Sequence, residues 1–212
     1  MSATGRSDVR DQSDHYATPA FCVRRLLERV QLPGGPWLEP CAGEGAVIKA
    51  VNELRSDVDW TAVEYRPECL KPLHALNLNS VQIDSFTTLS MPLRRAHFAV
   101  CLSNPPYRSA LPFVQRACEL ADIVVFLLRL NWLAGRERHA WLMKHVPNVY
   151  VLPDRPSFVD GGTDATDYAW MLWHREENVA GVIEVLATTP AEERRGSPDR
   201  ESAQLSLLGD AA

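Results

Sequence analysis

Short apolar runs alternate along the chain with segments whose apolar positions recur at helical spacing. The runs that predict strands are WLEP (37–40), DWTAVEY (59–65), SVQIDSF (80–86), HFAVCLS (97–103), DIVVFLLRL (122–130), NVYVL (148–152) and DYAWMLWHR (167–175), with VIEVL (182–186) as a candidate last strand. The segments that predict helices are 21–30, 46–55, 68–76, 111–121 and 135–146. This alternation predicts a largely parallel α/β sheet, in which ligands bind beyond the carboxyl ends of the strands.

Composition favours one sizeable domain. The chain has 212 residues, 46% of them hydrophobic, which is enough to bury a core. No run of about 18 apolar residues occurs, so we expect no membrane span, and the polar N-terminus lacks a signal core. The five cysteines are odd in number and widely spaced without a CxxC pair. We expect reduced thiols in a cytoplasmic protein, without disulfides or a metal site.

Charge does not indicate a nucleic-acid partner by itself. The formal net charge is −5, whereas nucleic-acid binding usually leaves a basic footprint. Such a function would need a local patch or a partner. We expect a disordered lead-in over residues 1–14, one domain over 15–187 and a disordered tail rich in Pro, Ser, Glu and Arg over 188–212.

A rigid bend follows the predicted strand at 97–103. In SNPPYR, Pro105 and Pro106 cannot donate to a strand ladder, and each restricts the residue before it. The strand therefore ends in a stiff turn with an amide, Asn104, on one side and an aromatic ring, Tyr107, on the other. A plain strand-ending turn is the structural alternative.

A glycine turn follows the first predicted strand. In EPCAGEGAV, Gly43 and Gly45 allow the backbone to pass close to a ligand. Glu64 ends the next strand, 19 residues after Gly45, where an acid can accept the hydrogens of two ribose hydroxyls. Asp84, in the third strand, can accept from an adenine amino group. Together these positions indicate a nucleoside cofactor.

The segments LEPCAGEGAV, AVEY, IDSF and SNPPY together resemble the S-adenosylmethionine-dependent methyltransferases of the Rossmann-like class, over residues 15–186. The resemblance implies the class I α/β fold, a mostly parallel seven-stranded sheet with helices on both faces. It implies S-adenosyl-L-methionine as cofactor. The implied cofactor-binding residues are Tyr16, Thr18, Pro19, Glu39, Pro40, Cys41, Ala42, Gly43, Gly45, Glu64, Asp84 and Asn104.

The NPPY segment resembles the amino-methylating branch of this class. There the Asn side-chain oxygen and the next backbone carbonyl, here those of Asn104 and Pro105, accept hydrogen bonds from the target amino group. Tyr107 would stack on a flat target, and Pro106 completes the implied catalytic set. Relatives with this loop methylate adenine N6 in DNA, guanine N2 in ribosomal RNA, or a glutamine amide of release factors, so NPPY leaves the target open.

Two segments favour adenine in DNA. DHYATPAF (14–21) resembles the segment that precedes the glycine turn in N6-adenine DNA methyltransferases, where residues matching Tyr16, Thr18 and Pro19 close over the cofactor. A helix cap, with Thr18 before Pro19 at the first helical position, is the structural alternative.

The second segment, RPSFVDGGTDATDYAWMLW (155–173), resembles the late region of small phage-type adenine methyltransferases. Ser157 and Phe158, followed by Gly161 and Gly162, would then lie near the target base; an ordinary Gly-rich loop is the alternative. The implied substrate-binding residues are Tyr107, Arg108, Ser157 and Phe158.

We therefore expect an S-adenosylmethionine-dependent DNA (adenine-N6) methyltransferase. The target base would flip out of the duplex, and the rim should be basic; the candidates are Arg108, Arg129, Arg136, Arg138 and Lys144. No segment is long enough for a separate target-recognition domain. The alternatives are an RNA-base or protein-glutamine methyltransferase with the same loop, and a non-catalytic adaptor that retains the fold. The oligomeric state is open.

The tail contains QLSLL (204–208), which resembles the peptide with which bacterial replication and repair proteins bind the DNA sliding clamp. Leu207 and Leu208 would fill an apolar pocket, and Gln204 would hydrogen-bond beside it. Such a tether raises the effective concentration near DNA. A chance match is the alternative for so short a motif.

Overall fold

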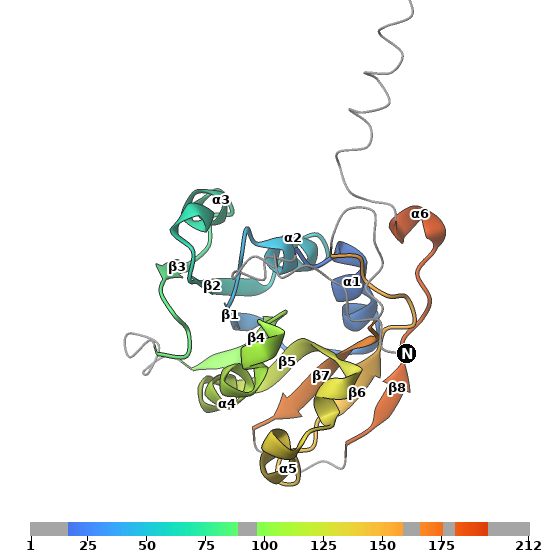
Figure 1. Cartoon of the computed structure of the whole chain (residues 1–212). Coiled ribbons are helices and arrows are strands. Elements are labelled where there is room, and N and C mark those ends of the chain that lie inside the picture. The colour runs from blue at the N-terminus through green and yellow to red at the C-terminus, as the bar shows by residue number, and fades with distance from the viewer. Residues whose placement is uncertain (1–16, 89–96, 159–165, 176–180, 195–212) are drawn as a thin grey trace, which may run out of the picture.

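The computed structural model describes residues 17–88, 97–158, 166–175 and 181–194 (Figure 1). Within them, one eight-stranded sheet has the order β3-β2-β1-β4-β5-β7-β6-β8. Its strands are β1 Gly35–Glu39, β2 Val58–Glu64, β3 Ser80–Ile83, β4 Phe98–Ser103, β5 Ala121–Arg129, β6 Asn148–Val151, β7 Tyr168–His174 and β8 Ile183–Val185. Strands β3, β2, β1, β4 and β5 pair in parallel, and β7 is antiparallel to both β5 and β6.

Helices cover both faces of the sheet (Figure 1). The described helices are α1 Ala20–Arg29, α2 Ala46–Asn52, α3 Leu70–His74, α4 Ala110–Leu120, α5 Arg136–Leu142 and α6 Ala191–Arg194, with the 3-10 turns η1 Pro67–Cys69, η3 Tyr107–Ser109 and η4 Leu130–Leu133. Helices α1, α2 and α3 lie on one face, and α4 and α5 lie on the other.

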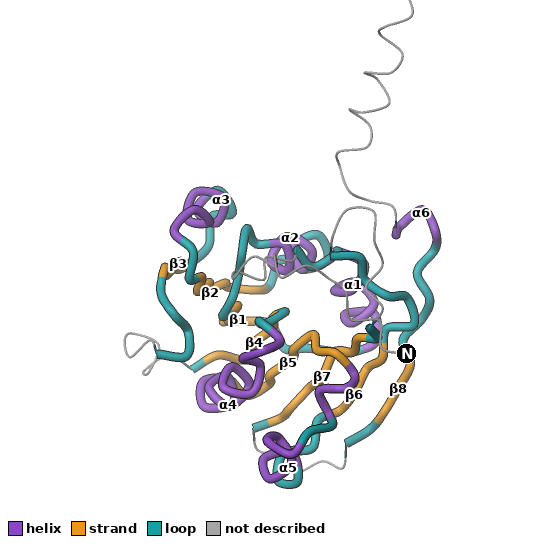
Figure 2. The backbone as a smooth tube through the Cα atoms, in the orientation of Figure 1, coloured by secondary structure: helices purple, strands orange, loops and turns teal. Residues whose placement is uncertain are grey.

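The alternation of side chains along β5 divides the core into two layers. Val125 and Leu127 pack into the cluster under α1 and α2, whereas Val124 and Phe126 pack into the cluster under α4. A strand buried on both faces needs a continuous apolar sequence, which is what DIVVFLLRL supplies. The loops after β1, β2, β3 and β4, which include teal segments of the tube in Figure 2, contribute residues to one cavity at the carboxyl ends of the strands.

Most expected elements are found within one or two residues of their expected bounds, and VIEVL contributes the eighth strand, β8, parallel to β6. The α/β fold class expected from the sequence is therefore confirmed, but the described sheet has eight strands and not the seven that the resemblance implied, because β8 adds to β6. The tail begins later than expected: Thr189 is buried, and Glu193 pairs with Arg24 and Arg25 of α1. Residues 188–194 thus pack against the domain.

Several expectations fall on residues that the structure does not describe. These are the roles of Tyr16, Gly161, Gly162 and the clamp-like segment at 204–208. All five cysteines are free thiols in the structure. No helix in the described ranges is long and apolar enough to cross a membrane, and those ranges contain no cluster of metal ligands.

Candidate functional site

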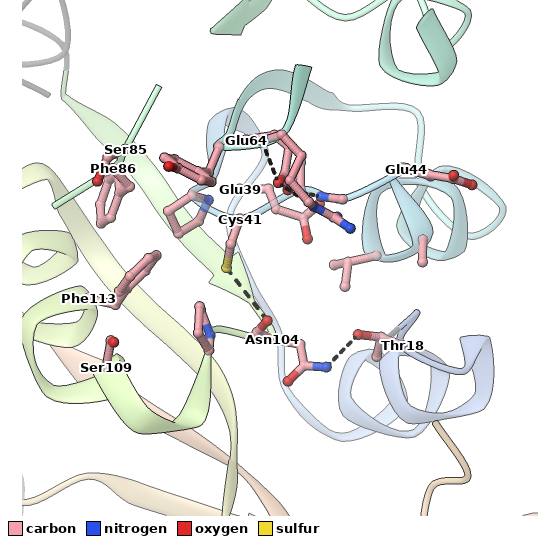
Figure 3. Close-up of a pocket in the computed structure, with 18 of the residues that line it drawn as sticks. Thr18, Glu39, Cys41, Glu44, Glu64, Ser85, Phe86, Asn104, Ser109 and Phe113 are labelled. Carbon is pink, nitrogen blue, oxygen red and sulfur yellow. Dashed lines mark hydrogen bonds and ion pairs between the residues drawn. The ribbon is translucent and has the colours of Figure 1, made fainter. Parts of the chain in front are cut away.

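A cavity of about 580 Å³ opens where the loops after β1, β2, β3 and β4 meet (Figure 3). Parallel strands bring their carboxyl ends to one edge, so residues far apart in the sequence converge there. The lining residues foreseen from the sequence are Thr18, Glu39, Pro40, Cys41, Ala42, Gly43, Glu64, Asp84, Asn104, Pro106 and Arg108. The site therefore combines both chemically distinctive segments, the glycine turn and NPPY.

The glycine turn forms one wall of the cavity. Gly43 lies at φ 54° and Gly45 at φ 81°, in the left-handed region that disfavours other residues. A Cβ on Gly45 would also stand 2.4 Å from a methyl group of Leu76. Gly45 does not line the cavity; it starts α2 and packs against α3, so its role is to shape the turn. The Gly43 backbone N–H donates to Glu64 Oε2 at 2.6 Å.

Glu64 is a buried carboxylate held in place by its neighbours. In addition to Gly43, the Arg66 backbone N–H and Nε both donate to Oε1 at 3.0 Å. These contacts fix the orientation of the carboxylate at the end of β2. Each carboxylate oxygen has further lone pairs, so Glu64 can still accept hydrogen bonds from a pair of hydroxyls in the cavity.

Glu39 is a buried acid with one oxygen left over. It is 2% exposed, and its Oε2 has no hydrogen-bond partner among the described residues. Burial, and then the nearby Glu64 charge, raise the pKa of Glu39 well above its usual range, against a backbone hydrogen bond from Ile48. An unpartnered buried acceptor costs free energy unless a ligand supplies a donor, so Glu39 is suited to bind an ammonium or hydroxyl group.

The far wall of the cavity is aromatic. Phe86, which follows β3, is buried and lies against Phe113 of α4, with ring centroids 5.4 Å apart. Asp84 accepts from the Ser85 backbone N–H at 2.7 Å and is otherwise open to the cavity. An acceptor beside apolar ring surface is what a flat base with an amino group requires. Tyr65, at the end of β2, also lines the cavity.

Asn104 lies at the opposite end of the cavity, directly after β4. Its Nδ2 donates to Thr18 Oγ1 at 3.1 Å (Figure 3). That bond leaves Oδ1 as the free end of the amide, and Oδ1 is buried without a partner within the described residues. Next to this turn, Cys41 Sγ lies 2.8 Å from Ser103 Oγ and 3.5 Å from the Asn104 carbonyl oxygen. The turn thus presents a fixed, unsatisfied acceptor.

Thr18 does not cap α1. Pro19 holds the N-cap position and α1 has no side-chain cap hydrogen bond, since the Cys22 backbone N–H bonds to the Pro19 carbonyl. Thr18 is 5% exposed, and its hydroxyl instead accepts from the Asn104 amide and orients it. This joins the segment before the glycine turn to the NPPY turn, which the sequence places 86 residues apart.

Tyr107 belongs to an aromatic group beside the cavity and does not line it. Its ring lies 5.6 Å from that of Tyr168, which in turn lies 5.2 Å from Phe158. The guanidinium of Arg129 covers the Tyr107 ring at 5.0 Å. The Tyr107 hydroxyl is buried, and burial raises its pKa far above the usual range.

The remaining sequence-predicted residues lie outside the cavity lining. Pro19 starts α1, Pro105 is buried behind the turn, and Ser157 is exposed. The lining residues missed from the sequence include Tyr65, Arg66, Phe86 and Phe113. Tyr65 and Phe86 follow the predicted acids by one and two residues, a signal that was available; Phe113 is contributed by helix packing and had none.

The residues of the cavity fit S-adenosyl-L-methionine in chemical type. Asp84 with Phe86 suits the adenine, Glu64 suits the ribose hydroxyls, and the unpartnered Oε2 of Glu39 suits the amino group of the methionine part. The glycine turn lets the backbone approach between them. The cavity therefore offers acceptors and an aromatic surface for the adenine, the ribose and the amino group of that molecule.

Comparisons with solved structures agree with this fold. A predicted O-methyltransferase from Agrobacterium tumefaciens matches with a TM-score of 0.60 and 16% identity over 81% of this chain and 88% of its own. A proposed RNA methyltransferase from Pyrococcus horikoshii matches with a TM-score of 0.56 and 15% identity over 79% and 88%.

A third match is the modification subunit of a proposed type I restriction enzyme from Vibrio vulnificus, with a TM-score of 0.58 and 14% identity. It covers 97% of this chain, which spans only 55% of that protein. No family model and no curated protein matches. At these identities the matches show the fold alone: the chain has the class I methyltransferase fold.

Proposed function

We propose that the chain transfers a methyl group from S-adenosyl-L-methionine to the N6 amino group of adenine in DNA. The observation that carries this proposal is the buried, unpartnered Oδ1 of Asn104, held at the end of a cavity suited to a nucleoside. An amino group entering the turn would satisfy it.

Asn104 acts by holding the target. An exocyclic amino nitrogen is a poor nucleophile because its lone pair is delocalised into the ring. Two acceptors, Asn104 Oδ1 and the Pro105 carbonyl, would bind its two hydrogens and turn the lone pair out of the ring plane. The bond to Thr18 holds the plane of the amide in place, with its NH2 group directed at the Thr18 hydroxyl and Oδ1 on the other side. This gain is one of orientation and electrostatics.

S-adenosyl-L-methionine would supply an electrophilic methyl group, the nitrogen gaining the methyl as the sulfonium becomes a thioether. The cofactor would be bound by three other residues that line the cavity, Glu39, Glu64 and Asp84. The nitrogen becomes cationic as it gains the methyl group and then releases one proton to solvent water, which requires no strong base. No ionisable side chain of the NPPY turn is needed for that step.

Adenine in DNA is favoured by the segment that contains Thr18. Its resemblance to the segment preceding the glycine turn in N6-adenine DNA methyltransferases is supported by the contact between Thr18 and Asn104. A neighbour in the same class, the Vibrio vulnificus modification subunit, belongs to a proposed restriction enzyme. RNA and protein-glutamine targets remain as outcomes of the test.

The test is methyl transfer from labelled S-adenosyl-L-methionine to unmethylated bacterial DNA, total RNA and a protein extract, followed by nucleoside and amino-acid analysis. We expect N6-methyladenine in DNA from the native protein and none from Asn104→Ala. Label in RNA or protein alone would overturn the choice of substrate. Cofactor binding without transfer to any of them would favour an adaptor.

A further inference from the structure

Arg129 lies at the carboxyl end of the central strand β5, where the proposed target base would enter. It is the last residue of β5, and β4 pairs with β5 in parallel so that Ser103 lies opposite Phe126. β4 ends at Ser103, directly before the NPPY turn, and β5 continues past Phe126 to Arg129. Across β7, Arg129 lies opposite Tyr168. Strand pairing therefore fixes the backbone of Arg129 beside the turn.

The Arg129 side chain lies on the ring that the NPPY turn presents. Its guanidinium carbon is 5.0 Å from the Tyr107 ring centroid, and its Nε donates to Tyr168 Oη at 3.3 Å. Arg129 thus contacts the aromatic side chains of both Tyr107 and Tyr168. The other rim candidates differ. Arg108 lines the cavity itself, Arg138 bonds the carbonyls of Trp132 and Ala134, and Arg136 and Lys144 are exposed.

A guanidinium has two properties that matter at this position. It stacks on aromatic rings, and it binds phosphate through paired N–H groups. A target nucleotide brings both a ring that needs the face of Tyr107 and a phosphate on each side of its sugar. A base that stacks there would displace the guanidinium by a few ångströms, into reach of the adjoining phosphate.

We propose that Arg129 is a substrate-binding residue that covers the Tyr107 ring in the free protein and contacts the phosphate beside the target base in the complex. This rests on the proposed function and deepens it. A cation placed at the target would also favour DNA binding by a chain of net charge −5, because it contributes more than a distant one. The rival role is purely structural, with Arg129 only fixing the Tyr107 ring.

The experiment compares the native protein with Arg129→Gln and Arg129→Lys. Binding of a short duplex, taken from DNA that the native protein methylates or else from unmethylated bacterial DNA, is measured by anisotropy over a range of salt. Methyl transfer to the same DNA gives kcat and KM. Arg55→Gln is the matched control, because Arg55 covers the Trp37 ring at 5.1 Å next to the amino end of β2, at the opposite edge of the sheet.

For Arg129→Gln we expect KM to rise roughly tenfold, kcat to stay within about twofold, and the slope of log affinity against log salt to weaken by about one. Arg129→Lys should retain the slope and part of the affinity, and Arg55→Gln should change neither. A loss of kcat with an unchanged salt slope would overturn the proposal in favour of the structural role.

The two proposals fail in different ways. Methylation of DNA by the native protein, with an unchanged KM and slope in Arg129→Gln, would remove only the role of Arg129. DNA binding without methylation, with a weakened slope in Arg129→Gln, would remove only the proposed reaction. A native protein that neither binds nor methylates DNA would overturn both.

Discussion

Two polar atoms, Oδ1 of Asn104 and Oε2 of Glu39, are buried in one cavity without partners among the described residues. Folding leaves such groups unsatisfied at a cost of roughly 1–3 kcal/mol each. That cost is tolerated where a ligand supplies the missing donors. The two atoms lie on opposite sides of the proposed methyl-transfer centre, one suited to the target and one to the cofactor.

The contact between Thr18 and Asn104 can be tested by itself. Thr18→Val removes the hydroxyl but retains the shape, so the Asn104 amide is free to rotate, and we expect kcat to fall about tenfold to a hundredfold. Thr18→Ser retains the hydroxyl and should stay close to native. Cofactor affinity is measured in parallel by calorimetry. A loss of affinity as large as the loss of kcat would mean that Thr18 serves the cofactor and not Asn104.

Glu39 should have opposite effects on stability and binding. The pKa of Glu39 is raised in the folded protein, so as pH rises past about 4.3 this carboxyl ionises first in the unfolded chain. Ionisation in the unfolded chain alone lowers the free energy of unfolding, from that pH up to the folded-state pKa. Glu39→Gln should therefore be more stable than native at about pH 7, with the difference shrinking toward about pH 4.

Urea unfolding at both pH values checks this prediction. Cofactor affinity should fall in Glu39→Gln, because an ammonium group loses its carboxylate. Glu137→Gln, which changes an exposed residue of α5 outside the cavity lining, is the control and should change neither quantity. A Glu39→Gln variant less stable than native at both pH values would show that Glu39 is a structural acceptor.

At the scale of elements, α1 connects the C-terminal segment to the site. Arg25 is 9% exposed and bonds Glu28, Thr189 and Glu193, whereas the Arg29–Glu184 pair is open to solvent. The residues just before α1 include Thr18. Residues 188–194 therefore brace the helix that begins beside the NPPY turn.

We expect Arg25→Met to lower the free energy of unfolding by about 1–3 kcal/mol, because it removes the pairs with Glu28 and Glu193 and leaves the buried Thr189 hydroxyl without that donor. Arg29→Met removes an exposed pair and should cost less than about 0.5 kcal/mol. Urea denaturation of both variants measures the difference. Equal losses would contradict the bracing role of residues 188–194.

The sequence predicts elements better than side-chain contacts. The apolar run of β5 and the helical spacing of α1 and α4 mark their own positions, since local pattern determines them. The glycine turn, Glu64, Asp84 and Asn104 were found because they follow strands. The side-chain contacts of Tyr107 and Arg129 could not be predicted from the sequence, because they depend on packing against Tyr168. The short turn η4 also lacked a local signal.

At the scale of the whole molecule, the net charge of −5 predicts weak binding to DNA without a partner. The clamp-like segment at 204–208 offers such a partner, and we propose that it tethers the chain to the sliding clamp. Purified clamp should retain the native protein and lose it when Gln204 and Leu207 are both replaced by Ala. Equal retention, or none for either protein, would remove the idea.

The central claim is that Asn104 holds an amino group for methyl transfer in a cavity that binds S-adenosyl-L-methionine. The most direct measurement is the single-turnover rate of methyl transfer to DNA by the native protein and Asn104→Ala, each first shown to bind the cofactor. The account predicts cofactor affinities within about threefold and a rate at least roughly a hundredfold lower in the variant. Equal rates at equal affinity would contradict it.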